Sequence, residues 1–289
     1  MIKSTRQLKD KMNNITNGDS KMSQTLFRNY FMERFLERIS LSKYNNNFVL
    51  KGGMLMASML GLDSRATMDI DTSVFSIPLT VENAKNLIEE IAKIDIDDNV
   101  SFEVTDAEEI MEEHDYHGVR IKLIANFGTF KQPIKIDIST GDVITPSAVE
   151  YNYKLMLEDR SIPLLSYNLE TLLAEKLETI IARSTANTRM RDFYDVYLLS
   201  KTQYIDMQNL KSALYETAKS RNTDLSEENV ELVLSEISES NAMFVSWEKY
   251  KRDNYYVENF NWIDVVNESR ALIETALEIE QDHGFEMTM

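Results

Sequence analysis

Residues 51–71 read KGGMLMASMLGLDSRATMDID and contain the arrangement that most constrains the fold of this chain. The apolar residues 48–50 predict a short strand, which ends at Gly52 and Gly53, because glycine tolerates positive φ and close approach of another group. Residues 54–60 then favour a helix whose free N–H groups and positive dipole end would face an anion. The order of strand, glycine turn and helix therefore predicts a phosphate-binding position.

Asp69 and Asp71 follow in an alternating Met-Asp-Ile-Asp stretch, so both carboxylates share one face of a predicted strand. Two such carboxylates suit Mg²⁺, or Mn²⁺ in its place, because these ions take oxygen ligands and keep substrate phosphates in their shell. No Gly-Lys-Ser/Thr follows the glycines, and the third glycine of a dinucleotide fingerprint is missing. A glycine turn or an acidic strand face alone would be ordinary structure, but together they indicate a nucleotidyltransferase-like site.

Asp137 is a candidate third carboxylate. It lies in the alternating stretch of residues 134–139, where the isoleucines face the core and Lys135 and Asp137 face the other way. A third acid can complete a two-metal site or accept the proton of an attacking hydroxyl, although an exposed strand face is the ordinary alternative. Asp142, which follows a predicted turn at Gly141, is an alternative for the same position.

The C-terminal half supplies a candidate cation and a further acid. Lys176 falls on the apolar stripe of a predicted helix over residues 169–183, where a buried ammonium would seek an anionic partner unless it snorkels to the surface. Asp192 lies in the first turn of the next predicted helix, where it could orient Lys176, accept a proton, or simply be an acidic residue that the helix dipole favours. Arg189 and Arg191 could hold phosphate by bidentate contacts.

Composition excludes several kinds of site. The chain has 289 residues and no cysteine, which rules out disulfides, thiolate zinc sites and cysteine nucleophiles. Its formal net charge of −17 opposes strong nonspecific nucleic-acid binding, while a local cationic patch could still hold phosphates. We find no apolar run long enough to span a membrane and no secretory signal, so we expect a cytoplasmic protein without a membrane partner.

Two kinds of pattern divide the chain and predict an α+β fold. Strand signals alternate with helices up to about residue 160, including two antiparallel strands joined by a hairpin turn at 128–131. Pro163 and short polar residues then indicate a connection, after which helical periodicity dominates. We therefore expect a mixed-sheet, nucleotidyltransferase-like lobe over residues 1–165 and an all-helical lobe over 166–289.

Five motifs in this order resemble the AbiEii/AbiGii toxin family, the nucleotidyltransferase-fold toxins of bacterial type IV toxin–antitoxin and phage abortive infection systems. They are Lys51-Gly52-Gly53, Arg65-x-Thr67-x-Asp69-Ile70-Asp71, Lys135-Ile136-Asp137, Glu175-Lys176-Leu177 and Arg191-Asp192-x-Tyr194-Asp195. The resemblance covers roughly residues 45–200. Many polymerase-like relatives have Gly-Ser where this chain has a glycine pair, so one hydroxyl is missing here.

The resemblance implies roles for particular residues. Asp69 and Asp71 would bind Mg²⁺ and the nucleotide, with Asp137 as the third metal-site carboxylate. Lys176 would contact phosphate, and Asp192 would be essential for activity. The residues expected to bind the nucleotide are Lys51, Gly52, Gly53, Arg65, Thr67 and Arg191.

The implied reaction is transfer of a nucleotide from an NTP to an RNA acceptor, the tRNA 3′ end, which stops translation. A separately encoded antitoxin that need not bind the toxin directly would neutralise it. Two alternatives remain open at this point: a small-molecule nucleotidyltransferase of the antibiotic-modifying kind, and a noncatalytic nucleotide-binding module.

Overall fold

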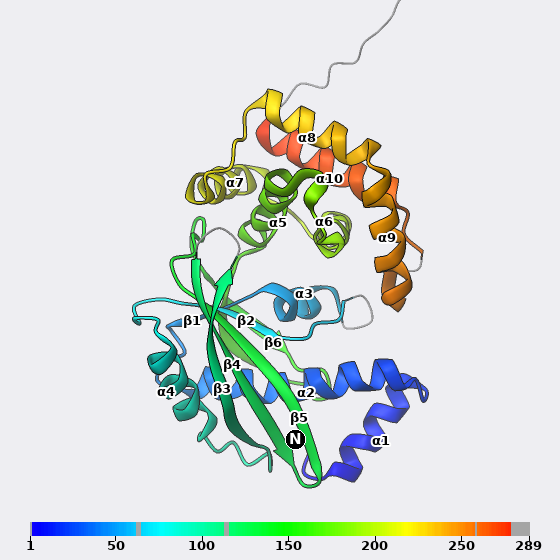
Figure 1. The fold of residues 1–289 in the computed structure, drawn as a ribbon. Coiled ribbons are helices and arrows are strands. Elements are labelled where there is room, and N and C mark those ends of the chain that lie inside the picture. Colours follow the sequence, from blue (N-terminus) through cyan, green and yellow to red (C-terminus); the bar gives the residue numbers. More distant parts are fainter. Residues whose placement is uncertain (1, 62–64, 113–115, 258, 279–289) are drawn as a thin grey trace, which may run out of the picture. The chain divides into compact units, whose positions relative to one another are not determined.

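The computed structural model divides the chain into two compact units, and each is described by itself. The residues it describes are 2–61, 65–112, 116–257 and 259–278. Unit 1 consists of Met1–Asp142 with Ala148–Tyr167, and unit 2 of Val143–Ser147 with Asn168–Met289. Unit 1 holds a mixed sheet with helices and unit 2 is helical, so the predicted α+β class is confirmed (Figure 1).

The sheet of unit 1 has the strand order β3-β4-β5-β2-β1-β7-β6 in the described part of the chain. The strands are β1 (Phe48–Lys51), β2 (Ile70–Val74), β3 (Ser101–Glu112), β4 (Tyr116–Phe127), β5 (Phe130–Ser139), β6 (Val149–Lys154) and β7 (Ser161–Ser166). Strand β2 is antiparallel to β1 and parallel to β5, while β3, β4 and β5 form an antiparallel meander. The predicted hairpin between β4 and β5 is thus present, with Phe127 opposite Phe130.

In the described part of unit 1, four helices accompany the sheet: α1 (Thr5–Thr16), α2 (Ser20–Leu41), α3 (Gly52–Leu60) and α4 (Val81–Ala92). The side chains of Asp19 and Thr80 cap α2 and α4 by accepting hydrogen bonds from first-turn N–H groups. In contrast, α3 has no side-chain bond from its own N-cap residue, Lys51, and starts directly from the end of β1. Its first N–H groups are therefore available to a carboxylate from another strand.

Alternation along the strands separates an apolar face from a polar one. Ile134, Ile136 and Ile138 of β5 are buried, as are Ile121 and Leu123 of β4. The intervening residues carry charge and point to the opposite face. Figure 1 shows α2 and α4 against the sheet, and both helices contact its strands. The polar face is therefore the one that can carry a functional site.

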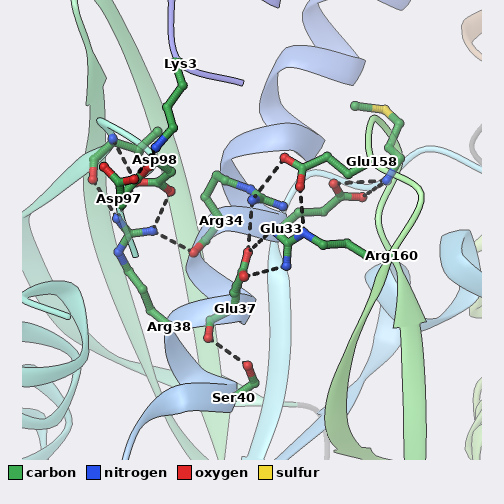
Figure 2. Close-up of polar contacts among 12 residues, drawn as sticks. Lys3, Glu33, Arg34, Glu37, Arg38, Ser40, Asp97, Asp98, Glu158 and Arg160 are labelled. Carbon is green, nitrogen blue, oxygen red and sulfur yellow. Dashed lines mark hydrogen bonds and ion pairs between the residues drawn. The ribbon is translucent and has the colours of Figure 1, made fainter. Parts of the chain in front are cut away.

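Helix α2 also carries a buried network of ion pairs (Figure 2). Arg34 Nη1 lies 2.9 Å from Glu37 Oε2, and Arg160 contacts the same carboxylate through Nη1 and Nη2 at 2.6 and 2.9 Å. Arg38 donates two hydrogen bonds of 2.9 Å to Asp98. Because these charges are paired, the helix can be buried against the β6–β7 hairpin and the segment before β3.

Unit 2 is built from six α-helices and two 3-10 turns in its described part. They are α5 (Leu169–Arg183), η1 (Ser184–Ala186), α6 (Met190–Thr202), α7 (Met207–Arg221), α8 (Glu227–Glu239), α9 (Asn241–Asp253), η2 (Tyr255–Val257) and α10 (Trp262–Leu277). Aromatic rings join α6, α9 and α10, with centroids 5.1 Å apart for Phe193 and Trp262 and 5.8 Å for Trp247 and Trp262. No described helix has both the length and the apolar character needed to cross a membrane.

The connection predicted near Pro163 is wrong, because this segment forms β7. Strand β7 pairs antiparallel with β6 along its whole length, and Leu165 and Ser166 pair parallel with β1. The proline is tolerated because pairing with β1 begins only at Leu165, beyond the position that lacks an N–H. Because the segment has polar residues at both ends, the sequence pattern did not indicate that Ile162 and Leu164 are buried in a strand.

Candidate functional site

Four charged residues form a row across four neighbouring strands of unit 1. In the sheet register, Lys51 of β1 is opposite Asp71 of β2, Asp71 is beside Asp137 of β5, and Asp137 is opposite Arg120 of β4. Residues paired in this way point to the same face of a sheet. The row therefore brings two predicted carboxylates together and places one cation on each side of them.

Asp71 contacts the start of α3. Its Oδ2 atom accepts a hydrogen bond of 3.0 Å from the backbone N–H of Gly53. Gly52 has a φ of +62°, and a β-carbon there would lie 2.1 Å from the same Oδ2 atom. The glycine turn therefore admits the carboxylate to the positive end of the helix dipole, where an anion is stabilised.

Asp69 lies directly before β2, and its side chain is partly exposed. Its Oδ1 atom is nevertheless buried and accepts no hydrogen bond from the described residues. The Nζ atom of Lys135 lies 3.5 Å from this oxygen, beyond a good hydrogen-bond distance. An unsatisfied carboxylate oxygen two residues from Asp71 is a suitable donor for a hard divalent cation.

Asp137 is held by Arg120. The Nε atom of Arg120 donates to Oδ1 at 2.8 Å and its Nη2 atom donates to Oδ2 at 2.6 Å, so both carboxylate oxygens are engaged. This bidentate pairing raises the pKa of the Arg120 guanidinium, chiefly through the hydrogen bonds to Asp137. Arg120 was not identified from the sequence, although alternation along β4 and the hairpin register place it opposite Asp137.

Asp142 binds Lys51. The Nζ atom of Lys51 lies 3.2 and 3.3 Å from the two carboxylate oxygens of Asp142, and Ser139 donates a hydrogen bond to Oδ2. Burial opposes ionisation of Asp142, but the charge of Lys51 and the Ser139 hydroxyl outweigh it and lower the pKa of the carboxyl. In the sheet register, Asp137 and not Asp142 is the neighbour of Asp71.

Arg65 and Thr67 lie in the segment before β2, and both are buried. The hydroxyl of Thr67 donates to the backbone oxygen of Asp69 at 3.2 Å, and the Arg65 guanidinium donates to the backbone oxygen of Ala66. A β-carbon on Gly53 would lie 2.2 Å from Thr67 Oγ1 and 3.9 Å from Arg65 Nη2. These two predicted residues thus surround the start of α3.

The remaining predicted residues belong to unit 2. The Nζ atom of Lys176 on α5 lies 3.0 Å from Asp192 Oδ1 and 2.7 Å from Asp195 Oδ2, both on α6. Arg189 Nε lies 2.7 Å from the other oxygen of Asp192. Burial opposes ionisation of Asp192, but the charges of Lys176 and Arg189 prevail and lower its pKa. Arg191 is exposed beside this buried cluster.

The structure thus gathers the predicted residues into two groups, one in each unit. Among the described residues, no set of three or more His, Asp or Glu side chains is spaced to hold a metal ion. Both oxygens of Asp137 accept hydrogen bonds from Arg120. From the sequence, Asp195 was named only as part of a motif. It lies about one helical turn after Asp192 on α6, so its carboxylate also reaches Lys176.

Comparisons with known proteins identify related sequences and folds. A family model described as nucleotidyl transferase AbiEii toxin, type IV TA system, matches residues 34–263. MenT4, a nucleotidyltransferase toxin from Mycobacterium tuberculosis H37Rv, is similar in structure with a TM-score of 0.54 and 14% identity, over 93% of this chain and 97% of that one. JHP933 from Helicobacter pylori gives a TM-score of 0.50 and 16% identity, over 88% and 92%. No curated protein sequence gives a significant match.

Proposed function

Because the chain belongs to the AbiEii family of nucleotidyl transferase toxins from type IV toxin–antitoxin systems, we propose that it transfers a nucleotide from an NTP to an RNA acceptor. The proposed acceptor is the 3′ end of tRNA, whose modification blocks translation and growth and can serve abortive infection. Family membership also implies an antitoxin partner. We expect that antitoxin to be encoded separately and to act without forming a stable complex, and we expect the toxin to work in the cytoplasm.

The observation that carries this proposal is the position of Asp71. Its carboxylate accepts a hydrogen bond from the first turn of α3, and Asp69, two residues away, has a buried Oδ1 atom without a hydrogen bond from any described residue. Asp69 and Asp71 would hold Mg²⁺ or Mn²⁺, with Asp137 as the neighbouring third carboxylate. A divalent ion bound there would stabilise the negative charge that develops on the triphosphate.

In the proposed reaction, an acceptor hydroxyl attacks the α-phosphorus of the NTP. A new phosphorus–oxygen bond forms, the bond to the β-phosphate bridging oxygen breaks, pyrophosphate leaves, and the hydroxyl proton passes to a carboxylate or to water. Most of the rate enhancement would come from positioning and charge stabilisation. In our proposal the nucleotide is bound by the residues around the start of α3 and by Arg191, while Lys176 contacts phosphate.

Asp192 would act through Lys176. The 3.0 Å contact between them fixes the position of the ammonium in a buried setting. Arg189 contacts the second oxygen of Asp192, so this carboxylate is held from two sides. A residue in this environment can orient a phosphate-binding lysine without touching the substrate itself.

The test is transfer of label by the purified protein. It is incubated with Mg²⁺, each α-labelled NTP in turn, and either total RNA or a panel of small hydroxyl acceptors, with the Asp69→Ala variant as control. We expect labelled tRNA and released pyrophosphate with the wild type and neither with the variant. Label on small acceptors alone would identify a small-molecule nucleotidyltransferase. An unchanged triphosphate in every mixture, with undiminished toxicity of Asp69→Ala in cells, would identify a noncatalytic nucleotide-binding module.

A further inference from the structure

A cavity separate from the proposed active site lies in unit 1, where α1, α2 and the start of β5 meet. Its volume is about 430 Å³, which is within the usual range for small-molecule sites. Asn17 and Gly18 have φ values of +49° and +87°, and this left-handed turn lets α2 begin directly after α1. The last turn of α1 and the first turns of α2 therefore line the cavity together.

The cavity lies on the face of the sheet opposite to the proposed active site. Phe130 and Gln132 of β5 line it. Alternation along the strand places both on the side of buried Ile134, whereas Asp137 points the other way. At the usual rise per residue, Asp137 is also about 23 Å further along the strand. One NTP bound at the proposed active site therefore does not reach this cavity.

Two phenyl rings supply the apolar part of the lining. Phe27 of α2 and Phe130 of β5 stack with their centroids 5.2 Å apart and an interplanar angle of 29°. Both side chains are only half-buried, so part of each ring is accessible. The Nζ atom of Lys9 lies 4.9 Å from the centre of the Phe130 ring and places a cation beside the pair. Aromatic side chains of this kind are the usual contact surface for unpaired bases.

Amide and hydroxyl groups supply the polar part. Four of these side chains form no hydrogen bond with any described residue: Asn13, Ser20, Ser23 and Gln24. Gln132 donates from Nε2 to the backbone oxygen of Pro133 at 3.0 Å, which leaves its Oε1 atom as an acceptor. An amide presents a donor and an acceptor side by side, which matches the polar edge of a nucleobase.

The lining is also uncharged. The chain has a formal net charge of −17, yet none of the described residues that line this cavity is acidic or basic. The nearby carboxylate of Asp19 is turned to the backbone, where its Oδ1 atom accepts a hydrogen bond of 2.9 Å from Met22 N. Phosphate contacts need cations, so they cannot dominate binding here. A flat, uncharged group with polar edges fits the lining better.

We propose that this cavity binds an unpaired nucleobase, with apolar contact to the phenyl rings and hydrogen bonds to the amide side chains. A base of single-stranded RNA and the base of a free nucleotide present the same ring, and the experiment below distinguishes them. A base of the acceptor RNA bound here would hold that RNA away from its reacting end. The inference goes beyond the proposed function, because this binding requires neither a metal ion nor nucleotide transfer.

The first test measures binding without catalysis. The full chain is titrated, in buffer with EDTA, into a fluorescein-labelled RNA oligonucleotide of mixed sequence without base pairing, and fluorescence anisotropy is followed. Asn13→Ala/Gln24→Ala is compared with Asn14→Ala/Gln208→Ala, which makes the same two changes at exposed residues outside the cavity. We expect at least about 10-fold weaker RNA binding in the first double variant and less than about 2-fold change in the second.

Competition identifies the source of the base. AMP and ribose 5-phosphate, which differ in the base alone, are each added to the RNA complex. AMP that binds as tightly as the RNA would assign the cavity to a free nucleotide, and RNA binding much tighter than AMP would assign it to single-stranded RNA. Displacement by ribose 5-phosphate equal to that by AMP would overturn the proposal, because phosphate alone would then be recognised. Equal RNA binding by the two double variants, or no binding of either probe, would overturn it as well.

The second test locates the bound base. The same RNA carrying 5-iodouridine is crosslinked to the wild-type chain by ultraviolet light, and the modified peptides are identified by mass spectrometry. We expect crosslinks at Phe27 or Phe130, and we expect them to weaken in Asn13→Ala/Gln24→Ala. Crosslinks confined to unit 2 would contradict the proposal. A wild-type protein that binds RNA in this cavity and transfers nothing would refute the proposed function alone.

Discussion

A β-carbon at position 53 would lie 2.2 Å from the Oγ1 atom of Thr67 and 2.9 Å from its Cβ atom, so Gly53 and Thr67 are matched in size. The Thr67 hydroxyl occupies the space that a serine side chain at position 53 would need. In this chain a hydroxyl reaches the start of α3 from the segment before β2. The second glycine is therefore required by packing.

This relationship predicts that Gly53→Ala destabilises the protein by about 1–3 kcal/mol through overpacking. Thr67→Gly in the same chain removes both clashing atoms and should recover part of the loss. The measurement is the denaturant midpoint of the wild type, the two single variants and the double variant. If Gly53→Ala costs as much with Gly at position 67 as with Thr, the contact is not the cause.

Part of the site was predictable because it depends on local periodicity. Alternation placed Asp69 and Asp71 on one face and Asp137 on the polar side of β5, and the hairpin turn at 128–131 was recognised. Counting back from Phe127 and Phe130 in that hairpin reaches the pairing of Arg120 with Asp137. Arg120 was missed because a cation on a strand face is usually only a solvated residue.

Other parts depend on long-range pairing that no local pattern encodes. Strand β7 joins β1 in parallel across more than a hundred residues, and only two residue pairs define that contact. The binding of Lys51 to Asp142 likewise depends on how far a flexible side chain reaches from β1. Lys51 was expected at the nucleotide, and in the structure its ammonium is engaged by a buried carboxylate.

The Asp71→Asn variant should distinguish the effect of Asp71 on stability from its effect on catalysis. Asp71→Asn keeps an oxygen that can accept the hydrogen bond from Gly53 N, so we expect its free energy of unfolding to stay within about 1 kcal/mol of the wild type. Loss of the negative charge should nevertheless lower nucleotide transfer at least about 100-fold. Denaturation curves and initial transfer rates on the same preparations provide the measurement. A fully active Asp71→Asn protein would exclude Asp71 as a metal ligand.

We expect Lys176 to stabilise the fold of unit 2 in addition to its proposed contact with phosphate. Lys176→Met would leave Asp192 and Asp195, both fully buried, without their shared cation and should cost about 3–5 kcal/mol. Adding Asp195→Asn should recover part of this loss, because one buried charge is then removed. Thermal unfolding provides the measurement, with Lys201→Met as the control.

Lys201 forms an ion pair of similar type with Glu268, but half of its side chain is exposed. We expect its removal to change stability by less than about 1 kcal/mol. Equal effects of Lys176→Met and Lys201→Met would show that the buried cluster does not stabilise unit 2. Activity lost in Lys176→Met should be interpreted only at temperatures where that variant remains folded.

Glu33 on α2 predicts a pH dependence of stability (Figure 2). Its carboxyl is buried and accepts hydrogen bonds of 3.0 Å from Asn29 Nδ2 and from the backbone N–H of Met156. Burial raises its pKa from 4.5 to about 8, despite those hydrogen bonds and the nearby charge of Arg34. The native protein therefore binds a proton that the unfolded chain releases above about pH 4.5.

A pKa that is raised in the folded state gives a contribution that is fully present below the unfolded pKa and is lost as pH rises through the folded one. Between pH 6 and 8 the wild type should therefore lose about 2 kcal/mol of unfolding free energy relative to Glu33→Gln, which is neutral at every pH and keeps an acceptor oxygen. Denaturant midpoints of both proteins at the two pH values provide the measurement. Because other titrating groups are shared, parallel pH curves for the two proteins would mean that Glu33 is already ionised at pH 6.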